Sequence, residues 1–162
     1  MIPTVKKILY ATDLSENARY AFGYAATMAN LFGAHITMIH VIEEFTPSAK
    51  GLLVNYLGED GWNEIQARRE KEFHELIRKR LTDFCEEMKE ELDNCPFLVE
   101  RVITRQGKAA EEILKLAAEG DFDLVVLGTH GYGLLADTLM GSTSRRVVRR
   151  SLVPVLTVRF PG

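Results

Sequence analysis

Hydrophobic positions in the first part of the chain fall into two patterns, short apolar runs and a stretch with helical spacing. Residues 5–11 and 35–41 are apolar runs that predict two β-strands. Between them, apolar residues recur at steps of three and four after Ser15, a good N-cap, and Gly33 supplies a stop. Strand, helix and strand of these lengths predict a right-handed crossover and parallel pairing.

The rest of the chain repeats this alternation. The spacing predicts a long helix from Trp62 to about Leu92, with one apolar and one charged face. Apolar runs predict strands at 97–104 and 124–127, and the second is typical of a strand buried on both faces. A helix is expected after Gly107, another over 143–151, and a last strand at 153–158. The predicted fold class is therefore α/β, with five mainly parallel strands and helices on both faces.

Residues 43–61 fit neither pattern. Pro47, Gly51, Gly58 and Gly61 predict an irregular loop insertion within a single domain spanning 1–162. The insertion also carries apolar residues, which is unusual for a solvated linker. Three uses for them remain open: packing on the body of the domain, covering a ligand crevice, or meeting a partner chain.

Composition narrows the class of protein. With 162 residues and 46% hydrophobic content, the chain can bury the core of one domain. Its net charge of −3 argues against nucleic acid as a partner. The chain contains no run of 18 apolar residues, so no membrane span is expected. The N-terminus lacks the apolar core of a signal peptide. Two cysteines at this spacing match no metal or redox motif, and we expect them to be reduced in a cytoplasmic protein.

The candidate chemistry lies in the stretch 123–144, where the buried strand is followed by glycines and hydroxyl residues. Gly128, Gly131 and Gly141 come in turn, and Ser142, Thr143 and Ser144 open the next helix. Glycines let the backbone approach a phosphate closely, and the first N–H groups of a helix lack partners within it. This order of features predicts an anion site at the start of the helix.

The spacing Gly128-x-x-Gly131, nine residues, then Gly141-Ser142 resembles the nucleotide-binding signature of the universal stress protein family in its ATP-binding form. The resemblance covers nearly the whole chain. It implies a Rossmann-like fold of the adenine nucleotide alpha hydrolase type, with strand order 3-2-1-4-5. It also implies a nucleotide-dependent regulatory module in the stress response, with Mg²⁺ or Mn²⁺ accompanying ATP, and a homodimer formed through strand 153–158.

Asp13 follows the first strand, at the sheet edge where open α/β folds hold their ligands. Taken alone it is a turn residue or a helix cap, whereas the resemblance makes it an acceptor for the adenine or the ribose. Val41 is a buried strand residue whose backbone, by the same resemblance, contacts the adenine. His130 is either a loop-tip residue or a polar group beside the phosphates. The expected binding residues are Ala11, Asp13, Val41, Leu127, Gly128, His130, Gly131, Gly141, Ser142, Thr143 and Ser144.

Evidence for catalysis is weak in the sequence. The Walker loop is absent, because no Lys follows a glycine pair at the required spacing. No residue near the glycine motif stands out as a water-activating base. We therefore expect a binding module with slow or absent hydrolysis. A slow ATPase, another nucleotide-dependent enzyme on the same site, and a dimeric scaffold that binds no nucleotide are the alternatives.

Overall fold

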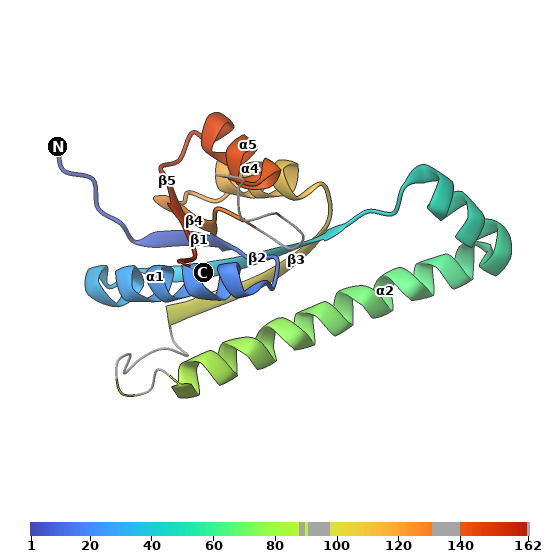
Figure 1. Ribbon diagram of the computed structural model, residues 1–162, viewed down its shortest axis with the longest axis horizontal. Coiled ribbons are helices and arrows are strands. Elements are labelled where there is room, and N and C mark those ends of the chain that lie inside the picture. The colour runs from blue at the N-terminus through green and yellow to red at the C-terminus, as the bar shows by residue number, and fades with distance from the viewer. Residues whose placement is uncertain (88–89, 91–97, 131–139, 162) are drawn as a thin grey trace.

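The computed structural model describes residues 1–87, 90, 98–130 and 140–161. Its centre is a sheet of five parallel strands in the order β3-β2-β1-β4-β5 (Figure 1). The predicted parallel sheet and its strand order are confirmed. The strands are β1 Lys7–Ala11, β2 His35–Glu43, β3 Val99–Gly107, β4 Leu124–Gly128 and β5 Val155–Val158.

Helices cover both faces of the sheet, as predicted (Figure 1). One face packs against α1 (Glu16–Phe32) and α2 (Pro47–Glu87), and the other against α4 (Ala109–Glu119) and α5 (Ser142–Arg150). Each face has its own apolar core. Strands β1, β2 and β4 are buried between the two helical layers and read as nearly continuous apolar runs, whereas β3 and β5 are only partly buried.

The first helix begins and ends where the sequence predicts. Ser15 caps it, accepting a hydrogen bond from the Ala18 N–H at 3.1 Å. Gly33 ends it with φ +64°, the left-handed conformation that favours glycine. Alanines on the buried face let α1 lie close to the sheet, and its amino end lies beside the end of β1.

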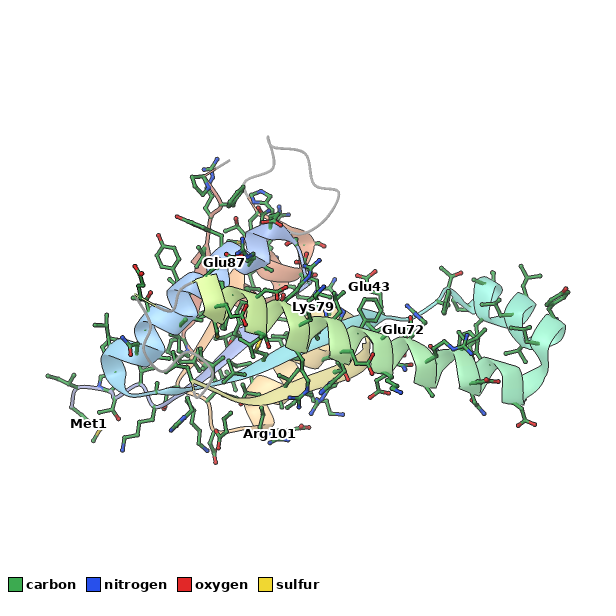
Figure 2. The ribbon with its side chains drawn as sticks, turned by 90° about the horizontal axis from the view of Figure 1, so that it is seen from below. Met1, Glu43, Glu72, Lys79, Glu87 and Arg101 are labelled. Atoms are coloured by element: carbon green, nitrogen blue, oxygen red, sulfur yellow. The ribbon has the colours of Figure 1, made fainter. Side chains whose placement is uncertain are left out.

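The prediction of an irregular loop over 43–61 is wrong for most of that segment. Residues 47–61 belong to α2, which runs from Pro47 to Glu87 with a break only at Gly58, where φ is +77°. Pro47 suits the first position of a helix, and Gly58 lets the chain turn while both sides stay helical. The broken end of α2 projects well beyond the sheet, and its remaining length runs back across β2 and β3 (Figures 1 and 2).

The expectation of reduced cysteines is also wrong for Cys85, which is disulfide-bonded. Cys95, the other cysteine of the chain, lies outside the described residues. That expectation rested on the number of cysteines and on the expected cytoplasmic location. Neither of these tells which side chains lie close together in the fold. Among the helices that the structure describes, none combines the length and the apolar character needed to cross a membrane.

Candidate functional site

The site is created where β1 ends before its neighbour does. At the last residue of β1, Ala11 pairs with Ile39 of β2 and with Leu127 of β4. Thr12 N–H then donates to the Ile39 carbonyl at 3.0 Å, and the chain leaves the sheet. Strand β2 continues to Glu43, paired there with β3. The result is a notch at the carboxyl edge of the sheet, at the point where strand order reverses.

Val41 lies on the open side of this notch. In a parallel strand, alternate residues direct their N–H and C=O groups to the same neighbour. Ile39 faces β1, so Val41, two residues on, presents its donor and acceptor to the space that β1 has left. A backbone donor beside a backbone acceptor matches the edge of a purine base.

Asp13 lies in the turn that joins β1 to α1. Its Oδ1 accepts hydrogen bonds from the Ser15 N–H at 3.0 Å and the Ser15 hydroxyl at 2.5 Å. These bonds fix the carboxylate against the start of α1 while leaving the residue exposed to the notch. Asp13 can therefore be both a turn residue and a ligand-binding residue, because the hydrogen bonds of the turn use only its Oδ1.

The two ends of the glycine-rich stretch meet at Thr129, the residue that follows β4. The Thr129 carbonyl accepts hydrogen bonds from the Gly141 N–H at 2.6 Å and from the Ser144 hydroxyl at 2.9 Å. Gly141 is the N-cap of α5, and a glycine offers no side chain to cap the helix. Ser142 and Thr143, the first two residues of α5, both line the notch, so the backbone N–H groups that open the helix lie beside it. The buried Ser144 hydroxyl, in contrast, serves to hold the two ends of the stretch together.

Gly128 and His130 connect this stretch to α1. A Cβ on Gly128 would lie 3.4 Å from the Asn17 carbonyl oxygen, an ordinary van der Waals distance, so the packing of β4 on α1 does not by itself require a glycine here. The Asn17 side-chain amide donates to the His130 carbonyl at 3.3 Å, and the His130 ring meets the Thr129 hydroxyl at 2.8 Å. The Asn17 hydrogen bond joins the segment after β4 to the first turn of α1.

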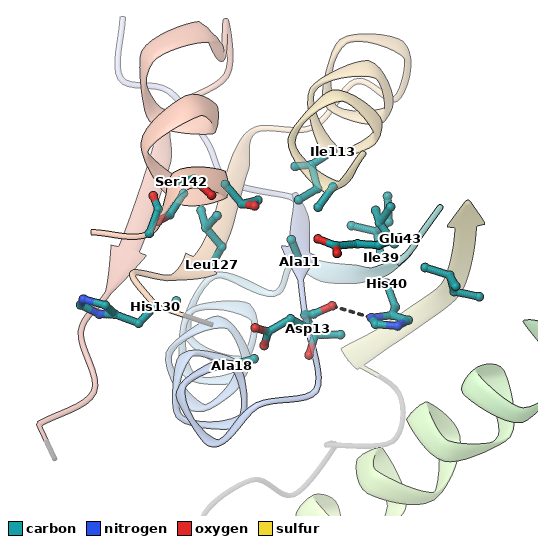
Figure 3. Close-up of a pocket in the computed structure, with 18 of the residues that line it drawn as sticks. Ala11, Asp13, Ala18, Ile39, His40, Glu43, Ile113, Leu127, His130 and Ser142 are labelled. Carbon is teal, nitrogen blue, oxygen red and sulfur yellow. Dashed lines mark hydrogen bonds between the residues drawn. The ribbon is translucent and has the colours of Figure 1, made fainter. Parts of the chain in front are cut away.

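The notch opens into a cavity of about 650 Å³, within the range of small-ligand pockets. All the expected binding residues except Gly131 line it, and Gly131 lies outside the described residues. Figure 3 shows Ser142 and His130 at one end, His40 and Glu43 at the other, and Asp13 between them. The structure thus brings together residues that the sequence places in three separate segments.

His40 lines the cavity, a role that its position in an apolar strand does not signal. Its ring Nδ1 lies 2.9 Å from the Thr12 carbonyl, which can only accept, so Nδ1 carries the proton. Burial lowers the pKa of His40, although the Thr12 hydrogen bond and nearby Asp13 act in the opposite direction. A neutral ring therefore faces the cavity, and it keeps an acceptor nitrogen.

The second wall that the sequence did not predict comes from α2. Phe73 packs against the His40 ring with centroids 4.9 Å apart, and Arg69 lies over the Phe45 ring at 4.5 Å. Both α2 side chains line the cavity, and Arg69 is the sole Lys or Arg among its described lining residues. Nothing in the sequence signals these residues, because their helix belongs to a segment far from the glycine motif.

The described part of the chain offers no cluster of side chains that would bind a metal ion by itself. No group of three or more His, Cys, Asp or Glu side chains is arranged there to hold an ion. Two carboxylates, Asp13 and Glu43, line the cavity. The donor set suits a cation that arrives with phosphate oxygens better than one held by protein alone.

Comparison with known proteins places this geometry in a family. The model of the universal stress protein family matches residues 4–159. Universal stress protein MJ0577 of Methanocaldococcus jannaschii is 32% identical over 154 residues, covering 95% of this chain and 94% of its own. The solved structure of MJ0577 superposes with a TM-score of 0.73 at 30% identity, over 99% of both chains. A universal stress protein solved in complex with cAMP shares the fold, with a TM-score of 0.58 at 20% identity over 97% of this chain and 98% of its own. The chain belongs to the universal stress protein family.

Proposed function

We propose that the chain binds ATP, or another adenine nucleotide, in the cavity at the end of β1 and acts as a nucleotide-dependent regulatory module in the stress response. One observation carries the proposal. A single cavity joins a backbone donor and acceptor at Val41, a carboxylate at Asp13 and the start of α5, whose N-cap is Gly141. These are the groups that a base, a ribose and a chain of phosphates require, in that order along the cavity.

The nucleotide would lie across the switch point of the sheet. The adenine would meet the N–H and C=O of Val41, and the ribose hydroxyls would donate to Asp13. The phosphates would lie against the first N–H groups of α5, from Ser142 and Thr143, with the Gly131 backbone as a further expected contact. The cAMP complex described above concerns another protein with this fold, and is consistent with an adenine nucleotide in such a cleft.

The charge of the cavity supports a divalent metal bound with the nucleotide. Arg69, the cation among the described lining residues, lies beside Phe45 just beyond β2, at the adenine end. The triphosphate would therefore meet neutral donors and the positive end of the α5 dipole, which offsets only part of its charge. Mg²⁺ or Mn²⁺ on the phosphate oxygens would supply the remainder.

The same distribution of charge favours slow turnover. Hydrolysis needs a residue that positions water and cations that stabilise charge on the transferred phosphoryl group. Among the described residues at the phosphate end, no Lys or Arg lines the cavity, and His130 is the one side chain there that could act as a base. We expect ATPase rates well below the roughly 10 per second of a typical enzyme. A steady-state rate above about one per second, abolished by a single change in the glycine stretch, would favour the enzyme alternative.

The direct test is to identify what the protein binds. Denaturing the purified protein should release an adenine nucleotide, which mass spectrometry would identify. Calorimetry on the nucleotide-free protein should give one binding site per chain for ATP with Mg²⁺. Adenosine should bind more weakly than ATP, and guanosine should bind less tightly than adenosine. Absence of binding by ATP, ADP, AMP and adenosine alike would leave the non-binding scaffold as the better description.

We also propose that the protein forms a homodimer through β5 and that it is cytoplasmic. Strand β5 is the edge of the sheet next to β4. Pro154 and Val158 direct their carbonyls to β4, so Val155 and Thr157 present their backbone groups to the open side. Such an edge invites pairing with another chain.

A further inference from the structure

The turn that carries Asp13 holds an unfavourable backbone conformation. Leu14, the next residue, has φ +67°, in the left-handed region that leucine rarely adopts. Its side chain is buried in the core beneath α1, with only 7% exposed. The position of Asp13 therefore depends on contacts that keep Leu14 in this conformation.

The turn lies between two cavities. Thr12 lines both the proposed nucleotide cavity and a second cavity of about 260 Å³, while Leu14 and Ser15 line the second. The buried Leu14 side chain anchors the turn in the core, and hydrogen bonds to its backbone hold the segment beside the cavities.

The hydrogen bond to the Leu14 carbonyl comes from α2. The guanidinium of Arg80 donates to this carbonyl across 66 residues of sequence. Arg80 makes no ion pair with a carboxylate in the described residues. Its fixed fork of donors can therefore be directed at the turn. On the near side of the turn, Leu14 N–H donates to the Thr12 hydroxyl at 3.0 Å.

We propose that Arg80 is a positioning residue for nucleoside binding: by holding the Leu14 carbonyl from α2, it keeps Asp13 oriented toward the ribose. The inference rests on the proposed function, because it assigns to Asp13 the nucleoside contact. Arg80 touches no part of the nucleotide cavity, so its effect on affinity passes through the turn. A second contact, Phe73 of α2 against His40, joins the same helix to the cavity wall.

This arrangement makes α2 sensitive to occupancy of the site. Coupling between two elements is reciprocal, so a ligand that fixes the Asp13 turn also favours the position of α2 that holds it. The broken, projecting end of α2 lies on the same helix. Nucleotide binding should therefore slow amide exchange in the part of α2 around Arg80.

The test is a double-mutant cycle read by calorimetry with adenosine and with ATP. Arg80→Met removes the donors while keeping the length of the side chain, and Arg80→Lys retains one donor group. Arg78→Met, an exposed arginine on the same helix, is the matched control. We expect Arg80→Met to weaken both ligands by the same factor, about two- to thirty-fold, with Arg80→Lys intermediate and Arg78→Met unchanged. In an Asp13→Ala background, Arg80→Met should cause no further loss.

Two results would overturn the assignment. One is parent-like affinity in Arg80→Met, and the other is a loss that adds in full to that of Asp13→Ala. If the parent itself binds neither adenosine nor ATP, the proposed function fails separately. The positioning role is then decided by amide exchange in the ligand-free protein. Arg80→Met must speed exchange of the Leu14 and Ser15 amides, and unchanged rates would refute it.

Discussion

Removing the carboxylate of Asp13 should separate the two ends of the proposed nucleotide site. Asp13→Ala deletes an acceptor, and Asp13→Asn keeps one oxygen for the Ser15 N–H while replacing the other with an amide. A hydrogen bond to a charged group contributes about 1.5–3 kcal/mol. Asp13→Ala should therefore weaken adenosine about 10- to 150-fold. ATP should weaken by the same factor, because the contact is with the shared nucleoside.

Calorimetry with adenosine and ATP on each folded variant measures both factors. Ser15→Ala is the control, because the Ser15 hydroxyl donates to Asp13 and accepts from the Ala18 N–H without lining the cavity. Losing this helix cap should lower the stability of the protein by about 1 kcal/mol. It should affect adenosine far less than the change at Asp13 does.

Three outcomes would refute this reasoning. If folded Asp13→Ala binds adenosine like the parent, Asp13 is only the turn residue that its sequence position allows. If ATP weakens while adenosine does not, the carboxylate lies at the phosphate end, and the orientation of the nucleotide is reversed. Equal losses in Ser15→Ala and Asp13→Ala would assign the effect to the turn as a whole.

Three further changes test other parts of the structure. Gly141 has φ −67° and ψ 163°, which valine also adopts, so Gly141→Val should fold and yet lose ATP affinity at least about tenfold; parent-like binding would place the phosphates elsewhere. Val155→Pro removes an N–H from the open side of β5 and should convert a dimer in sedimentation experiments to an 18 kDa monomer, whereas a monomeric parent at micromolar concentration would exclude the dimer. Burial lowers the pKa of His40, so the unfolded chain binds its proton first as the pH falls below about 6.5, and stability is lost through that range. Urea midpoints measured at pH 7 and pH 5 should therefore differ less in His40→Gln than in the parent, and an equal difference in both would remove His40 as the cause.

The sequence by itself determined the elements whose signals are local. Ser15 and Gly33 mark the ends of α1 because a cap and a left-handed stop depend only on neighbouring residues. Apolar runs reveal β1, β2 and β4 because these strands are buried on both faces. The glycine spacing carries a family resemblance, and that resemblance implied the strand order, which periodicity could not supply.

Tertiary structure decided what lies around the glycine motif. The segment 43–61 reads as irregular because glycines raise the cost of a helix by about 1 kcal/mol each. The structure nevertheless keeps it helical on both sides of Gly58. Arg69 and Phe73 reach the site, and Arg80 reaches the turn beside it, only because α2 packs along β2 and β3. No local pattern in the sequence reports that packing.

Local sequence patterns also do not report the backbone geometry of the site, and only the family resemblance pointed to the backbone of Val41. Val41 is open to the cavity only because β1 ends beside Ile39 while β2 continues, a fact of strand register. Leu14 adopts a left-handed conformation that its side chain disfavours, and the Arg80 hydrogen bond that accompanies it spans 66 residues. Local preferences act over a few residues, whereas the binding geometry depends on which strand stops first and which helix lies across its end.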